Sequence, residues 1–117
     1  GLTNRRCRGE RIPALFRKRL TATGKRRREE LVEGIENIQF QYLIDGQYVD
    51  ASQAINWSSV SAVKVWVLSR AICPEEGLTN GAAYRLGDQN FSPEDASSSR
   101  QYRRKLYSGV FSIRNTL

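Results

Sequence analysis

Residues 28–44 read REELVEGIENIQFQYLI, and the hydrophobic pattern of this stretch changes at its middle. Apolar residues of the first half recur at helical spacing: Leu31, Val32, Ile35 and Ile38. This spacing places them on one face, so we expect a short helix over residues 28–37. From Ile38 onward apolar and polar residues alternate, which predicts a half-buried strand over residues 38–44. The following Asp-Gly dipeptide predicts a hairpin turn and a return strand.

Further strands are predicted on both sides of this stretch. Residues 60–68 are apolar on both faces, which is typical of a central strand in a sheet covered on both sides. Residues 12–20 predict an edge strand, because lysine and arginine on an exposed edge discourage aggregation. Residues 82–86 predict a short strand, and residues 102–114 predict a long terminal strand. We therefore expect an α+β fold with antiparallel sheet and one short helix.

Basic residues are concentrated at the start of the chain. Residues 1–28 contain eleven basic residues and one acidic residue, whereas residues 29–117 contain eight basic and eleven acidic residues. The net charge of +7 therefore originates in the first segment. We expect a basic N-terminal segment over residues 1–28, which includes the edge strand, and a globular body over residues 29–117. The basic segment could bind phosphates or an acidic lipid surface, or it could simply be solvated.

The residue types argue against catalysis. The sequence contains no histidine, which excludes Ser-His-Asp and Cys-His catalysis and histidine-ligated zinc. Glu29/Glu30 and Glu75/Glu76 are pairs in sequence only, because adjacent side chains point in different directions. The sequence also has no glycine-rich phosphate loop and no calcium-loop spacing. We expect no catalytic residue, cofactor, metal or small-molecule substrate, and hence a binding or assembly protein.

The two cysteines, Cys7 and Cys73, leave two interpretations open. They are too few for a tetrahedral metal site and do not form a C-x-x-C pair. A disulfide between them would close a long loop and stabilise the fold by roughly 3–4 kcal/mol. Two free thiols are equally compatible with the residues alone. No apolar run approaches the roughly 20 residues of a membrane helix, and the absence of methionine indicates a piece of a longer translated chain.

Nucleic-acid binding is an alternative function that the sequence does not favour. Aromatic residues lie beside two basic runs, Arg17–Arg19 and Arg103–Lys105, and such runs can bind single strands by stacking and charge. Such a module would use residues 5–28 and 100–105. The sequence contains no RNP-like or zinc-finger pattern to support it.

Three segments, in order, resemble the PilW-type minor pilins of type IV pilus systems. They are ELVEGIENIQFQY at residues 30–42, VSAVKVWVLSR at residues 60–70 with the preceding Trp57, and YRRKLYSGVFSIRN at residues 102–115. Two shorter elements, Cys7-Arg8-Gly9 and Leu15-Phe16-Arg17, resemble the family more weakly. The resemblance covers most of the chain.

The resemblance implies a pilin-like head that packs against other minor and major pilins when a type IV pilus is primed and assembled. It implies a periplasmic head, anchored in the inner membrane by an N-terminal helix that these residues lack, and later incorporated into the extracellular pilus. An oxidising periplasm would favour a disulfide between Cys7 and Cys73. Gly34 would allow the short helix to pack closely on the sheet. A type II secretion pseudopilin of the same architecture is the nearest alternative.

Overall fold

The computed structural model describes residues 1–53, 56–93 and 99–113, which form nine β-strands and one 3₁₀ helix. The elements are β1 (Leu2–Cys7), β2 (Glu10–Leu20), β3 (Arg26–Glu33), β4 (Ile35–Ile44), β5 (Gln47–Val49), η1 (Trp57–Ser59), β6 (Ala62–Arg70), β7 (Tyr84–Leu86), β8 (Gln89–Phe91) and β9 (Arg104–Ser112). All strand pairs are antiparallel. Within the described ranges, no helix has the length and apolar character that a bilayer crossing needs.

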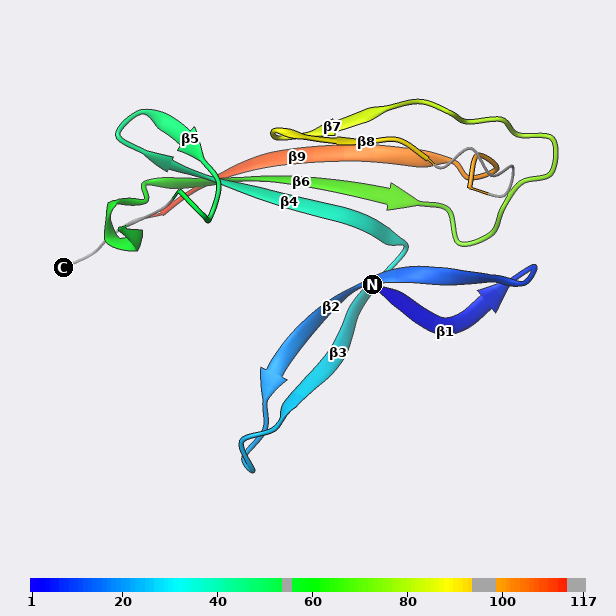
Figure 1. Cartoon of the computed structure of the whole chain (residues 1–117), viewed down its shortest axis with the longest axis horizontal. Coiled ribbons are helices and arrows are strands. Elements are labelled where there is room, and N and C mark those ends of the chain that lie inside the picture. Colours follow the sequence, from blue (N-terminus) through cyan, green and yellow to red (C-terminus); the bar gives the residue numbers. More distant parts are fainter. Residues whose placement is uncertain (54–55, 94–98, 114–117) are drawn as a thin grey trace.

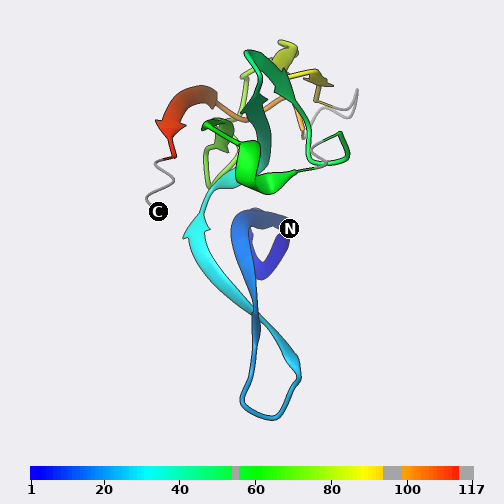
Figure 2. The same cartoon turned by 90° about the vertical axis from the view of Figure 1, so that its left-hand side faces the viewer.

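The first sheet consists of β1, β2 and β3, with β2 in the centre. β1 pairs only with the first part of β2, where Leu2 lies opposite Pro13. β3 pairs with the remainder of β2, as far as Leu20 opposite Arg26. The outer part of the β2–β3 hairpin is therefore a two-stranded ribbon. It projects away from the rest of the molecule (Figures 1 and 2).

The second sheet has the strand order β5-β4-β6-β9. Its β4–β5 hairpin turns at Asp45 and Gly46, whose φ angles of 49° and 77° are both positive, as a type I′ turn requires. A second hairpin, β7–β8, lies over one face of this sheet (Figure 1). The core under that hairpin contains three almost completely buried side chains: Leu68, Leu86 and Tyr102.

The predicted helix over residues 28–37 is wrong, because β3 and β4 occupy this stretch and meet at Gly34. Gly34 has a φ angle of +85°, which lets the chain turn sharply from the first sheet into the second. Its N–H donates to the Pro13 carbonyl at 2.8 Å, and its carbonyl accepts from the Arg70 N–H at 2.8 Å. A helix of this length with an interior glycine is marginal, whereas both strands gain paired neighbours.

The expected fold class is therefore also wrong. The α+β class and the pilin-like head with one short helix required that helix, and the described residues instead form an all-β fold of three antiparallel sheets. The role expected for Gly34 changes accordingly. Its glycine character serves a turn between sheets and not the packing of a helix.

The strand predictions outside this stretch fared better. The strands predicted over residues 38–44 and 60–68 correspond to β4 and β6, and β6 is central in its sheet. The strand predicted over residues 102–114 corresponds to β9, although Arg114 lies outside the described residues. The strand predicted over residues 12–20 is present as β2, and its pairing with the N-terminal residues ends at Ala14. Beyond Ala14 it pairs only with β3, so this part has the free edge that was predicted.

The molecule is elongated and has a small core. Its radius of gyration is 17.2 Å and its extents are 54 × 39 × 20 Å, whereas a compact domain of this length has a radius of gyration of about 13 Å. In the described part of the chain the buried apolar residues are Ile12, Ala14, Val60, Ala62, Leu68, Leu86 and Tyr102. β3 runs across the predicted boundary between residues 28 and 29, and the division into two parts stays a prediction.

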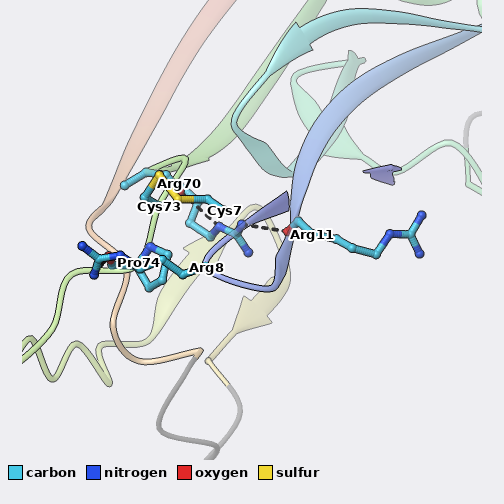
Figure 3. Close-up of a disulfide and its surroundings, with 7 residues drawn as sticks. Cys7, Arg8, Arg11, Arg70, Cys73 and Pro74 are labelled. Atoms are coloured by element: carbon cyan, nitrogen blue, oxygen red, sulfur yellow. Dashed lines mark hydrogen bonds between the residues drawn. A yellow bond between two sulfur atoms is a disulfide. The ribbon is translucent and has the colours of Figure 1, made fainter. Parts of the chain in front are cut away.

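A covalent bond and two hydrogen bonds clamp the two sheets together (Figure 3). Cys7 at the end of β1 forms a disulfide with Cys73, which follows β6, with a Cα–Cα distance of 5.3 Å. The flanking hydrogen bonds run from the Arg70 guanidinium to the Arg11 carbonyl at 3.2 Å and from the Arg8 guanidinium to the Pro74 carbonyl at 3.1 Å. The orientation of the first sheet therefore depends on this junction.

We expect Gly34→Ala to lower the free energy of unfolding by at least about 2 kcal/mol, because alanine is strained at positive φ. Its Cβ would also lie 3.2 Å from the Arg70 carbonyl oxygen. Gly46→Ala is the matched control, since Gly46 has a φ angle of +77° at the other end of β4 with no atom within 4 Å of a Cβ. Urea unfolding of both variants measures the difference. Equal losses would mean that the close approach at Gly34 contributes nothing.

The double variant Cys7→Ser/Cys73→Ser should unfold at lower urea than the unreduced parent chain. The disulfide closes a loop with a sequence separation of 66 residues, and removing a link of that span from the unfolded state loses about 4 kcal/mol. Thiol titration of the unfolded, unreduced parent is the control and should find no free thiol. Two titratable thiols, or an unchanged urea midpoint, would contradict the prediction.

Candidate assembly surface

Three rows of apolar residues cross the second sheet on one face, because residues opposite each other in antiparallel strands point to the same side. The rows are Ile38–Val67–Tyr107, Phe40–Val65–Gly109 and Tyr42–Val63–Phe111, taken from β4, β6 and β9. We call these nine residues the apolar face. The alternation in β4 and β9 predicted one apolar side, and residues 60–68 were predicted to be apolar on both sides. The register aligns one side of each strand into a single surface.

The apolar face is largely uncovered by the described residues. Phe111 is 63% exposed, Tyr107 is 50% exposed and Phe40 is 44% exposed. At one end of the face, the Trp57 ring of η1 packs edge-on against Tyr42 with a centroid distance of 4.8 Å. The prediction that the strand over residues 60–68 is covered on both sides is therefore wrong for the part of the chain described here. The β7–β8 hairpin lies over the opposite face of the sheet and does not cover the apolar face (Figure 1).

Two hollows shape this side of the molecule. A shallow hollow of about 220 Å³ lies on the apolar face around Gly109, between the rings of Tyr107 and Phe111 and beside Val65 and Val67. An open cleft of about 720 Å³ lies between the two sheets. Ile38 belongs to the apolar face and also lines this cleft, so the two hollows border one continuous surface.

A group of buried and half-buried charged and aromatic side chains supports the sheet near the junction. Arg104 donates two hydrogen bonds to Glu36, at 2.6 and 3.2 Å, and the Arg104 side chain is only 1% exposed. Arg70 lies directly opposite Arg104 in the register and stacks 3.8 Å over the Tyr102 ring. Burial raises the pKa of Tyr102 and lowers the pKa of Arg70. Arg70 and Arg104 would repel each other. The Glu36 carboxylate and the Tyr102 ring stabilise their two positive charges.

No sequence pattern predicted that these side chains lie together. Glu36 and Arg104 are separated by 68 residues, and nothing in either local pattern links them. The available signal was indirect: Arg70 and Arg104 both stand at strand ends, where an arginine facing inward needs an acidic partner.

The carboxylates that are adjacent in sequence do not form acid–base pairs. Glu29 accepts a hydrogen bond from Arg17 at 2.6 Å, which lowers the pKa of Glu29, whereas Glu30 accepts one from Arg5 at 2.6 Å. Glu75 likewise binds an arginine. Over residues 1–53, 56–93 and 99–113, no three histidine, cysteine, aspartate or glutamate side chains lie close enough to hold a metal ion. These carboxylates form ion pairs that stabilise the fold. The surface feature suited to binding is the apolar face.

A family model described as "Type IV Pilus-assembly protein W" matches residues 3–115, which is nearly the whole chain. No curated protein and no solved structure matches this chain.

We expect Glu36→Gln to destabilise the fold by about 3 kcal/mol, because it leaves the buried Arg104 charge without its partner. Glu75→Gln is a geometrically matched control: Arg103 binds Glu75 at the same distances of 2.6 and 3.2 Å, but on the surface. Its effect should be much smaller because solvent screens the pair. Thermal or urea unfolding of both variants tests this, and equal effects would show that the burial of Arg104 is unimportant.

Proposed function

Because this chain belongs to the PilW family of type IV pilus assembly proteins, we propose that it acts as the head of a minor pilin. In this proposal its apolar face packs against a neighbouring pilin subunit of the pilus. Assembly of type IV pili is the role of the family. The packing surface and its occupant are our inference.

The observation that carries the proposal is the exposure of the apolar face. Monomeric proteins rarely expose a contiguous apolar surface that spans three strands, and such surfaces usually mark interaction sites. The chain has a small core and buries little apolar surface of its own. The exposed apolar face is therefore a large share of the apolar surface that is available for packing. A partner that covers the face would add the burial that the isolated chain lacks.

The shape of the face favours a partner with protruding apolar side chains. The hollow at Gly109 is open between two exposed rings, so an inserted side chain would contact Tyr107 and Phe111 together. Aromatic residues of this kind dominate the binding energy of many interfaces. The cleft beside Ile38 would extend the contact toward the first sheet.

The disulfide supports a periplasmic location for this head. Disulfides persist in oxidising compartments such as the bacterial periplasm and are rare in the cytosol. We propose that the head faces the periplasm while the protein is anchored in the inner membrane by a preceding helix, and that it then enters the extracellular pilus. Other minor and major pilins would be its partners. The proposed role needs no small-molecule substrate and no enzymatic activity.

The test compares Phe111→Ser with Val110→Ser in cells that assemble the pilus. Val110 is the matched control, since it is 55% exposed on the same strand but points to the opposite face. We expect Phe111→Ser to weaken packing by about 2 kcal/mol, or roughly 30-fold in affinity, by the usual value of a buried phenylalanine. Piliation, and the amount of this protein in sheared pili, should fall for Phe111→Ser only.

Both variants should accumulate in the cell at the level of the parent, because both side chains are largely exposed in the free chain. Immunoblots of whole cells measure this. Parent-level piliation by Phe111→Ser, or an equal loss with both variants, would overturn the assignment of the apolar face to subunit packing.

A further inference from the structure

The outer part of the β2–β3 hairpin carries a concentration of charge that the proposed function does not use. Residues 17–28, which we call the basic hairpin, contain seven basic residues and no acidic residue. This equals the whole formal net charge of the chain, +7. The hairpin extends away from the second sheet, on which the apolar face lies (Figures 1 and 2). A subunit packed on that face therefore need not cover it.

The strand register places like charges directly opposite each other. Lys18 lies opposite Arg28 and Arg19 lies opposite Arg27. Like charges in such cross-strand positions destabilise a hairpin. A sequence selected for hairpin stability alone would have placed acidic residues in one of the two strands. This is the arrangement farther from the hairpin tip, where Arg17 lies opposite Glu29. The like-charged pairs nearer the hairpin tip therefore indicate that an anion outside the chain binds there.

The chain itself neutralises only part of this charge. Glu29 binds Arg17 at 2.6 Å and Arg19 at 3.4 Å, and Arg28 stacks 3.5 Å over the Phe16 ring. Among the described residues, four basic residues of the hairpin have neither an acidic partner nor a ring contact: Lys18, Lys25, Arg26 and Arg27. All four are exposed.

Both faces of the two-stranded ribbon carry basic residues. This arrangement helps to distinguish a flat anionic surface from an anion that surrounds the ribbon. Strand alternation puts Arg19 and Arg27 on one face and Lys18, Arg26 and Arg28 on the other. A flat lipid surface would contact one face and leave the cations of the other face in solvent. The major groove of B-form DNA admits a two-stranded β-ribbon and has phosphates along both of its walls.

The residue types narrow the partner further. Residues 17–28 contain no aromatic side chain, so the hairpin cannot hold single strands by stacking. Five of the seven basic residues are arginines, which bind phosphate oxygens with two parallel hydrogen bonds. The major groove of A-form RNA is too narrow for a ribbon. We infer that the basic hairpin binds the phosphate backbone of double-stranded DNA from within the major groove.

Binding of a 30-base-pair duplex of random sequence to the full chain, followed by fluorescence anisotropy, tests the inference. If the four unpartnered cations each contact one phosphate, affinity should fall about 150-fold between 50 and 200 mM salt, with a logarithmic slope near −3.6. Arg26→Gln/Arg27→Gln should halve that slope to about −1.8. Arg26→Lys/Arg27→Lys should restore it, because the charges return.

The control variant Arg85→Gln/Lys105→Gln removes two basic residues from the second sheet and the β7–β8 hairpin, and its slope should equal that of the parent. No variant should unfold at lower urea than the parent, since the substituted side chains are exposed and Arg27→Gln removes a like-charge pair. Absence of duplex binding at 50 mM salt, or an equal loss in both glutamine variants, would overturn the inference. So would tighter binding to oligo(dT), to phosphatidylglycerol vesicles or to polyglutamate than to the duplex.

Discussion

Gly34 donates a backbone hydrogen bond to Pro13 in the first sheet and accepts one from Arg70 in the second sheet. The shape of the molecule depends on this connection between the two sheets. The left-handed conformation of Gly34 lets two strands that are continuous in sequence belong to different sheets. Without the turn, residues 26–44 would form one long strand, and the first sheet would have no fixed direction. The disulfide between Cys7 and Cys73 closes the same corner from the other side. A backbone turn and a covalent bond thus orient two sheets that share little core.

The small core is accompanied by a large exposed apolar surface. The chain uses its best apolar packing on one face of the second sheet, beneath the β7–β8 hairpin, and leaves the other face to solvent. The nine residues of the apolar face are regular in register and mixed in size, with a gap at Gly109 between two rings. A surface of this kind resembles half of a protein interior. It is consistent with the role of the family in type IV pilus assembly.

The sequence predicted most of the second sheet because its strands carry a period of two in their own residues. Ile38, Phe40 and Tyr42 share one face by alternation alone, and so do Tyr107 and Phe111. The helix prediction failed because Leu31 and Val32 satisfy helical spacing by coincidence, whereas pairing of Val32 with Leu15 decides the structure. The pair of Glu36 with Arg104 could not be predicted, since no local pattern records a contact between distant segments. The basic residues were visible in the sequence, but their alignment in opposing rows depends on strand register.

The position of the disulfide also determines how the protein transmits mechanical load. Tension applied at the two ends of the chain would pass from Cys7 directly to Cys73, so that the intervening strands β2 to β6 would be bypassed. The load would then act between the end of β6 and the far end of β9, which run antiparallel and side by side. Pulling these strands from opposite ends shears their hydrogen bonds together instead of opening them one at a time. The pairing of β2 with β3 would therefore stay outside the path of the load, whereas β1, which precedes Cys7, would lie within it.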